Sequence, residues 1–283
     1  MKHILVPTDF SKNSFHALQY AIFLFNKEPC TFYILHAYQT TTSSLESQRN
    51  KTRKTRLFQI TKAEAENNLS RFFEKIILAN ENTQHTFKSL SIANSLLNAI
   101  GKSVIDYTID YIVMGTKGAT GLKSVFLGSN TVNVISKIDF CPIIAVPADC
   151  SFDAIDEILF ASGFEHICNK YELLPLINIA QLWDAKIKIL HWIGKNPVNA
   201  YKQNAREVIS QRLKNVSYEV IEVEKKHKIS TEIEQFVEKH EKVAMITMIN
   251  YWHSFLQKLT SEQVVNNVAF NTKVPFLVMH LPE

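Results

Sequence analysis

Four of the seven glycines in this chain stand in one segment, VMGTKGATGLKSVFLGSN, which runs from Val113 to Asn130. Glycine lets the backbone adopt positive φ or approach a ligand closely. The segment follows a short apolar strand, Tyr111–Met114, and ends where a helix should begin, near Ser129. The free amides and positive dipole end of such a helix suit phosphate. The sequence therefore predicts a phosphate-binding loop, and a purely conformational turn is the alternative.

The glycine spacing excludes two common phosphate-binding motifs. Counted from Gly115, a Walker A loop needs its second glycine where Thr120 stands, and the glycines at 115, 118, 121 and 128 do not fit GxGxxG. The observed pattern is G-x2-G-x9-G-S, with Ser129 last. Two lysines inside the loop, Lys117 and Lys123, could contact phosphate or could simply be solvated.

Alternating strands and helices must position this loop. Short apolar runs predict strands at Ile4–Val6, Thr31–Ala37, Gln84–Leu90, Tyr111–Met114 and Ile143–Val146. Helices are predicted from about Ser11 (with Phe15, Leu18, Ile22 and Phe25 on one face) and over Leu57–Asn80, Asn94–Tyr107 and Ser129–Ile138. This alternation is typical of a parallel sheet covered on both faces, which binds ligands outside the carboxyl ends of its strands.

The chain also repeats itself. HILVPTDFS from His3 matches EILFASGFE from Glu157, TFYILHAY matches KIKILHWI, and FCPIIAVP matches KVPFLVMH, in the same order. We interpret the chain as a duplication with domains at residues 1–148 and 152–283. In the second half we expect Pro197 in the first turn of a helix, capping boxes at Thr231–Glu234 and Thr260–Gln263, and a kink at Pro175.

These residues resemble the universal stress protein family. Gly115, Gly118, Gly128 and Ser129 match its ATP-binding signature, and ILVPTDFS, ILHAY, IDYIVMGTKG and CPIIAVP resemble its first, second, fourth and closing strands. The resemblance covers nearly all of residues 1–148 and, more faintly, residues 152–283. It implies an α/β fold of two tandem five-stranded parallel-sheet domains, a Rossmann-like sandwich of the adenine nucleotide alpha hydrolase type.

The resemblance also implies a site in the first half for ATP, with a divalent ion such as Mg. Asp9, with the backbone around Pro7, Thr8 and Ala37, would hold the adenosine. The phosphates would be held by Met114, Gly115, Gly118, Gly128, Ser129 and Asn130. From its place inside the loop, Lys117 is a further candidate for contacting them. Members of this family are regarded as nucleotide-sensing regulators, and no catalytic base or nucleophile stands near the loop, so we expect at most slow ATP hydrolysis.

The second half departs from the signature. Aligning Pro142 with Pro275 places Met248, Tyr251 and Ser261 at the glycine positions, and Gly163 takes the place of Asp9. We expect this half to have lost nucleotide binding. Its aromatic loop, Met248–Ser261, could fill a core or an interface, or line an apolar ligand pocket. In this family domains pair through their final strands, so Ile143–Val146 and Phe276–His280 could form an intramolecular pseudo-dimer, and a further homodimer stays open.

A basic segment, Thr40–Lys62, separates the second strand from the long helix. From Arg49 to Lys62 it carries six Lys or Arg and no acid. We expect a mobile, solvated loop, and the alternatives are a lid over the nucleotide or a weak contact with an acidic partner or RNA.

Composition narrows the function classes. The chain has 283 residues, is 46% hydrophobic and carries a net charge of +4, which does not indicate a nucleic-acid partner. No apolar run approaches the ~18–20 residues that span a bilayer, and the N-terminal run is broken at Pro7 and Asp9, so we expect no membrane anchor. The four cysteines form no CxxC, and the histidines form no metal-ligand pattern, so we expect reduced thiols and no metal site.

The sequence therefore indicates a cytoplasmic, nucleotide-dependent regulator of a stress response that binds ATP in its first half. The alternative is a protein of the same fold that binds no nucleotide and acts through protein partners. The triggering signal, the partner, and the choice among ATP, AMP and a cyclic nucleotide are open.

Overall fold

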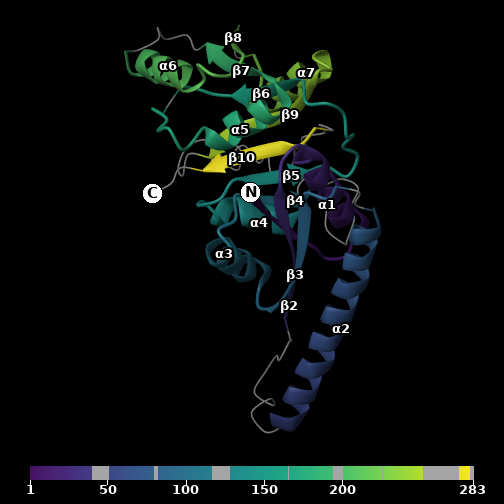
Figure 1. Ribbon diagram of the computed structural model, residues 1–283. Helices are drawn as coiled ribbons and strands as arrows, with labels where there is room; N and C mark the ends of the chain where they lie inside the picture. Colours follow the sequence, from purple (N-terminus) through teal and green to yellow (C-terminus); the bar gives the residue numbers. More distant parts are fainter. Residues whose placement is uncertain are drawn as a thin grey trace. The chain divides into compact units, whose positions relative to one another are not determined.

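The structure, a computed structural model (Figure 1), describes residues 1–39, 51–79, 82–116, 128–164, 166–193, 200–224, 226–250 and 274–280. The chain divides into two compact units, Met1–Met114 and Gly115–Glu283. Both are built from alternating strands and helices, as the sequence predicts. The proposed domain boundary near residue 150 stays a prediction.

The first unit contains a parallel sheet in the order β3-β2-β1-β4. Its strands are β1 (Lys2–Pro7), β2 (Cys30–Tyr38), β3 (His85–Ala93) and β4 (Tyr111–Gly115, which ends one residue past the unit boundary). Its helices are α1 (Lys12–Leu24), α2 (Lys51–Ala79) and α3 (Leu96–Asp106). Since β1 pairs with β2 on one side and with β4 on the other, the strand order reverses at β1, and their carboxyl ends lie at one edge.

Helix α1 begins where the sequence predicts, but its buried face differs. The Oγ of Ser11 accepts a hydrogen bond from the Ser14 amide and caps the helix. The buried side chains of α1 include Ala17, Leu18, Ala21 and Leu24. Of the four residues expected on one face, Leu18 and Phe25 are buried, whereas Phe15 and Ile22 are only half-buried. Small alanines let α1 approach the sheet closely, so the contact face turns toward them.

Helix α2 begins earlier than predicted. It covers Lys51–Ala79, so the part of the basic segment from Lys51 to Lys62 is helical and not a loop. Lys, Arg and Gln are good helix formers, which explains why a polar composition did not prevent the helix. Residues 40–50 lie outside the described residues.

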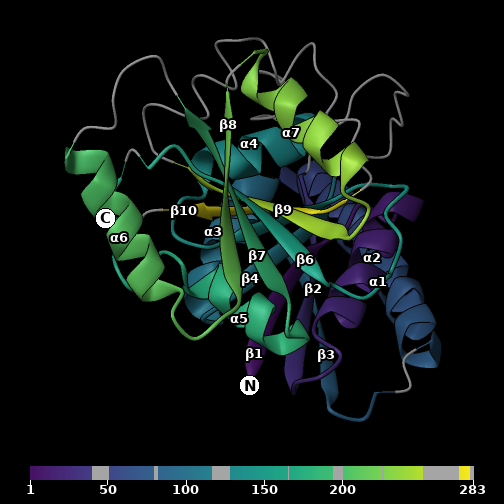
Figure 2. The same ribbon diagram turned by 90° about the horizontal axis from the view of Figure 1, so that it is seen from above.

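The second unit contains strands in the order β5-β10-β9-β6-β7-β8. Its strands are β5 (Ile143–Val146), β6 (Glu157–Ala161), β7 (Lys186–Ile193), β8 (Tyr218–Glu224), β9 (Val243–Asn250) and β10 (Phe276–His280). Its helices are α4 (Ser129–Lys137), α5 (Leu174–Trp183), α6 (Ala200–Arg212) and α7 (Ile229–Lys239). Figure 2 shows β6, β7 and β8 running together, as in Figure 1.

The predicted pairing of the two final strands is confirmed. β5 and β10 pair antiparallel, with Val278 opposite Ile143 and Leu277 opposite Ile144. All the other strand pairs described in this unit are parallel. Each final strand thereby covers an edge that would otherwise be open to other chains.

The strand connections repeat, which confirms the internal duplication. β6 pairs with β7 and β9 as β1 pairs with β2 and β4, and β7 pairs with β8 as β2 pairs with β3. The apolar matches seen in the sequence therefore reflect equivalent strands.

Two local predictions in the second half are wrong. Pro175 stands in the first turn of α5, which begins at Leu174, so it starts the helix and does not kink it. Helix α7 begins at Ile229 without a side-chain cap, so Thr231 lies inside the helix and cannot open a capping box. The carboxylate of Glu232 instead accepts the amides of Lys226 and His227, at 2.6 and 2.7 Å. Pro197 and Thr260–Gln263 lie outside the described residues.

Candidate functional site

The turn after β1 presents Asp9 at the carboxyl end of the strand. The Thr8 amide donates to the carbonyl of Leu35 at 2.8 Å, and the buried Thr8 hydroxyl accepts from the Phe10 amide at 3.0 Å. The carboxylate of Asp9 is exposed and accepts from the Ser11 amide at 3.0 Å. This turn therefore anchors its backbone on β2 while one carboxylate faces solvent.

Phe10, the next residue, holds an unusual backbone conformation. Its φ is 63°, in the left-handed region that costs a bulky residue free energy. Its ring lies 4.3 Å from the imidazole of His36 and 5.8 Å from the ring of Phe72. The Nδ1 atom of His36 donates to the carbonyl of Thr8 at 2.9 Å. These contacts offset the backbone cost and fix the turn that carries Asp9. Sequence reasoning did not identify the role of His36.

Two further predicted residues lie at neighbouring strand ends of the same unit. Ala37 is half-buried near the end of β2, and Met114 is buried near the end of β4. Pro7 is buried at the end of β1, between them. The structure thus brings Pro7, Asp9, Ala37 and Met114 to the edge where a doubly wound sheet binds ligands.

In the second unit, three hydrogen bonds organise the base of the glycine loop. The Gly115 carbonyl accepts from the Thr131 hydroxyl at 2.9 Å, and the Thr116 amide donates to the Val146 carbonyl at 3.0 Å. The Gly128 amide donates to the Thr116 carbonyl, so residues 116 and 128 meet and close the loop. Lys117 and Gly118 lie outside the described residues.

Helix α4 begins differently from α1 and α3. Ser11 and Ser95 cap those two helices with their side chains, whereas the N-cap of α4 is Gly128, which has no side chain to offer. Gly128 has φ −65° and ψ 152°, a conformation that any residue adopts. The backbone angle therefore does not require glycine at this position. Ser129 and Asn130, the first helical residues, are exposed.

The second half contains the same turn without its carboxylate. The Ser162 amide donates to the Leu190 carbonyl at 3.0 Å, and the His191 Nδ1 donates to the Ser162 carbonyl at 3.0 Å. Phe164 has φ 50°, and its ring lies 4.6 Å from that of His191. Burial lowers the pKa of His191, which keeps the imidazole neutral. Gly163 stands where the first half has Asp9.

A bulky side chain replaces Ala37 in the second half. In the matched strands LHAY and LHWI, Trp192 takes that position, and its side chain is 91% covered, with 9% exposed. Its Nε1 donates to the Glu232 carboxylate at 2.5 Å. Met248, at the position of Gly115, is buried in β9, and Tyr251–Ser261 lie outside the described residues. The change from Ala37 to Trp192 can be seen in the sequence repeat, where LHAY matches LHWI.

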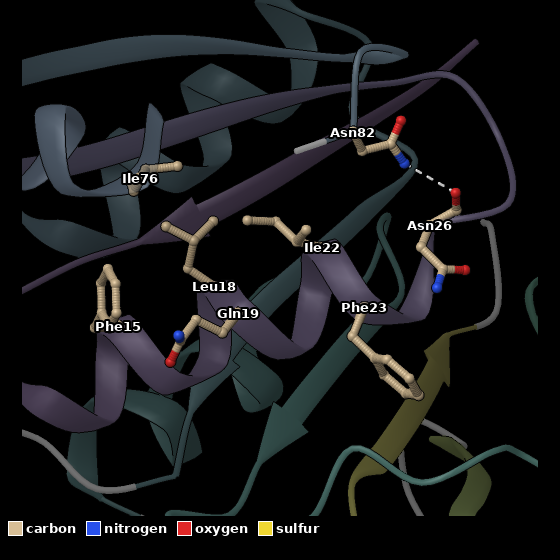
Figure 3. Close-up of a pocket in the computed structure, with 8 residues that line it drawn as sticks. All are labelled: Phe15, Leu18, Gln19, Ile22, Phe23, Asn26, Ile76 and Asn82. Atoms are coloured by element: carbon tan, nitrogen blue, oxygen red, sulfur yellow. Dashed lines mark hydrogen bonds between the residues drawn. The ribbon is translucent and has the colours of Figure 1, made fainter. Parts of the chain in front are cut away.

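Figure 3 shows a separate cavity of about 280 Å³ beside α1. Its wall is mostly apolar, with Phe15, Leu18, Ile22 and Ile76. The Asn82 side-chain amide at its rim donates to the Asn26 carbonyl at 2.9 Å. Since these asparagines follow α1 and precede β3, the rim lies at the amino ends of the strands. Because none of its described lining residues carries a charge, this cavity does not suit phosphate.

The described residues offer few reactive groups. They contain no group of His, Cys, Asp and Glu side chains that could hold a metal ion. The four cysteines are free and buried, and burial raises the pKa values of Cys30 and Cys150 to about 12. Both thiols therefore stay protonated and unreactive at neutral pH. Among the helices in the described part of the chain, none is long and apolar enough to cross a membrane.

Comparison with known proteins gives a family and a fold. A model of the universal stress protein family matches residues 1–147. No curated protein sequence matches the chain. Among solved structures, a universal stress protein from Archaeoglobus fulgidus DSM 4304 is similar over 98% of both chains, with a TM-score of 0.68 and 18% identity.

Two further solved structures are similar. A functionally unknown protein from Pseudomonas aeruginosa PAO1 is similar over 99% of this chain and 92% of its own chain. The TM-score is 0.60 and the identity is 11%. A universal stress protein family protein from Arabidopsis thaliana with AMP bound matches 52% of this chain over 92% of its own, with a TM-score of 0.33 and 15% identity. The full-length similarities support the α/β fold of both halves.

Proposed function

The chain belongs to the universal stress protein family, and we propose that its first half binds one adenine nucleotide, ATP in the first place, as a cytoplasmic regulator of a stress response. The observation that carries this proposal is Gly128, a glycine N-cap whose backbone angles any residue could adopt. A side chain there would stand over the first-turn amides of α4. Glycine leaves these amides open to an anion, as a phosphate-binding helix requires.

On the adenosine side, we assign the strand-end residues Pro7, Thr8, Asp9 and Ala37. Asp9 is exposed, and an ionised carboxylate is an acceptor only, so it suits the amino group of adenine or a ribose hydroxyl. Half-buried Ala37 leaves room where Trp192 fills the equivalent position of the second half. The small side chain therefore supports binding in the first half alone.

On the phosphate side, we assign the four signature residues and three of their neighbours: Met114, Gly115, Lys117, Gly118, Gly128, Ser129 and Asn130. Exposed Ser129 and Asn130 can offer a hydroxyl and an amide beside the first-turn amides of α4. Because the described residues contain no carboxylate cluster, a magnesium ion would arrive with the nucleotide and be held mainly by its phosphates.

This assignment makes the protein a nucleotide sensor and not an efficient enzyme. The four cysteines are buried, and burial raises the pKa values of Cys30 and Cys150 to about 12, so these two thiols are not available as thiolate nucleophiles. A competing function follows from the second half, which keeps the fold without Asp9. In this competing function neither half binds nucleotide, and both halves serve only as folded domains that bind protein partners.

The experiment that separates these functions is a nucleotide assay on the purified chain. Small molecules released by denaturation are compared with ATP, ADP and AMP standards, and the stripped protein is titrated with each nucleotide by calorimetry. About one adenine nucleotide per chain supports the proposed site. Neither released nucleotide nor measurable affinity would refute it and leave the partner-binding function.

A further inference from the structure

The cavity beside α1 has a buried apolar floor and a wall that solvent reaches. Leu18 is fully buried and Ile76 is 2% exposed, so these two side chains form the floor. Phe15, Ile22 and Phe23 complete the apolar lining and are half-buried. Figure 3 shows Leu18 and Ile22 on α1 with Ile76 across from them. The lining residues all belong to the first unit, so this cavity is a property of that unit by itself.

Aromatic contacts fix one end of this cavity. The ring of Phe15 meets the ring of Phe72 edge-on, with centroids 5.5 Å apart and an interplanar angle of 87°. The ring of Phe72 also lies edge-on to that of Phe10, at 5.8 Å. Aromatic pairs in this arrangement stabilise their own geometry beyond the area that they bury. Phe15 is therefore held at the cavity wall by its neighbours, which favours a cavity that exists before any ligand binds.

The polar lining residues are all neutral amides, and these are Gln19, Asn26 and Asn82. Asn82 is fixed, because its side-chain amide donates to the Asn26 carbonyl at 2.9 Å and its Oδ1 accepts from the Gln84 amide at 2.9 Å. The exposed side chains of Gln19 and Asn26 each carry an NH₂ donor and a carbonyl acceptor. A hydroxyl or carbonyl group of a ligand would find partners here. An ion would find no opposite charge among the described lining residues.

Size and lining together indicate the class of ligand. An apolar cavity of ~150 Å³ admits benzene, so a volume of about 280 Å³ admits a molecule nearly twice as large. A helix of a protein partner, ~10–12 Å across, is too wide for it. We propose that this cavity binds a small neutral molecule that has a hydrocarbon body and one hydroxyl or carbonyl group. The body packs on Leu18, Ile22 and Ile76, and the polar group bonds to the amides.

This cavity is separate from the proposed nucleotide site. Its asparagine rim lies at the amino ends of the strands, whereas the nucleotide is assigned to their carboxyl ends. The inference therefore does not rest on nucleotide binding, and its test needs no nucleotide.

Ligands that share one hydrocarbon chain and differ only in the polar end test this proposal. Octanol, octanoate and octylammonium are each titrated by calorimetry into the full chain at neutral pH. We expect octanol to bind the protein at least about tenfold more tightly than either charged relative, because a charged end would lose hydration at the rim without gaining a counter-charge. Bound octanol should also raise the melting temperature of the chain, since it binds the folded state alone.

Filling the cavity gives a matched pair of variants. Ile22→Trp places an indole in the cavity and should weaken octanol binding at least about tenfold, because the ligand then has no space to enter. Ile105→Trp makes the same exchange on α3, where the side chain is 73% exposed, and should bind octanol like the parent. Circular dichroism melting shows whether both variants fold. If Ile22→Trp does not, Ile22→Phe makes the same test with a smaller ring.

Three results would overturn the proposal. In the first, octanol does not bind the parent. In the second, the three ligands bind equally, so the neutral lining selects nothing. In the third, Ile22→Trp and Ile105→Trp bind octanol with the same affinity. If the parent binds no octanol and forms dimers that Ile22→Trp dissociates, a second copy of the chain covers this face instead.

Discussion

The ring of Phe10 lies 4.3 Å from the imidazole of His36, and the ring of Phe164 lies 4.6 Å from that of His191. In both pairs the phenylalanine has positive φ. The histidine Nδ1 donates to the carbonyl of the residue two positions before that phenylalanine, which is Thr8 in the first half and Ser162 in the second. The turn therefore persists in both halves for packing, independent of any ligand. What differs within it is Asp9 against Gly163, so the carboxylate is the feature of this turn that only the first half has.

Replacing Asp9 tests the adenosine side of the proposed site. Asn keeps the oxygen that accepts the Ser11 amide but removes the charge, so Asp9→Asn should leave the fold intact. A hydrogen bond to a charged group is worth about 1.5–3 kcal/mol, so nucleotide affinity should fall about 10- to 100-fold. Calorimetric titration measures this loss. Asp110→Asn, elsewhere in the unit, is the control, and an equal loss there would count against the assignment.

Replacing Gly128 tests the phosphate side. Because its backbone angles suit any residue, Gly128→Ala should change the free energy of unfolding by less than about 1 kcal/mol. Gly128→Trp should abolish nucleotide binding because the indole covers the first turn of α4. Gly118→Val should do the same through the loop. Ser261→Trp, at the matching position of the second half, should leave the affinity unchanged. If Gly128→Trp binds like the parent, the phosphates lie elsewhere.

The strained turn makes a prediction about stability. At Phe10, alanine would lose the aromatic contacts and keep the cost of positive φ, whereas glycine would lose the contacts but not pay that cost. Phe10→Ala should therefore be less stable than Phe10→Gly by about 1 kcal/mol. In the interior of a helix the order is the opposite, because there alanine stabilises more than glycine. Urea unfolding of the two variants measures the difference. Equal stability would mean that the turn relaxes to negative φ.

His280 makes the stability depend on pH. Burial at the end of β10 lowers its pKa to about 4, with Asp139 opposing the shift. The unfolded state, with an ordinary pKa near 6.5, then binds more protons between about pH 6.5 and 4, so this part of the stability is lost as the pH falls through that range. From pH 7 to 5 the loss from this residue should be about 2 kcal/mol. Urea unfolding at both pH values should show a smaller loss for His280→Gln than for the parent.

Much of the first half could be predicted because its signals are local. Apolar runs bounded by turn residues placed β1, β2 and β5, and helical periodicity placed α1 and α3 to within about two residues of their observed starts. The repeat and the glycine spacing indicated the family, since matching residues occur in the same order in the chain. The family resemblance pointed to Asp9 and Gly128 as site residues, and their roles stay predictions.

Other features depend on contacts between distant segments. Phe10 takes positive φ because its ring packs on His36 and Phe72, which come from β2 and α2. Glu232 bonds the amides before α7 and the indole of Trp192, forty residues away, so no capping pattern in the local sequence could describe it.

By itself, the sequence determined the alternation of strands and helices, the duplication, the family and the signature positions of the candidate site, because each of these is written in periodicity or spacing along the chain. Only the tertiary structure decided that Phe10 takes positive φ against His36, that the pairing of β5 with β10 is antiparallel, and that the backbone angles of Gly128 do not require glycine. Those outcomes depend on which side chains and backbone groups meet across the fold, and the free energy of such contacts outweighs local preference.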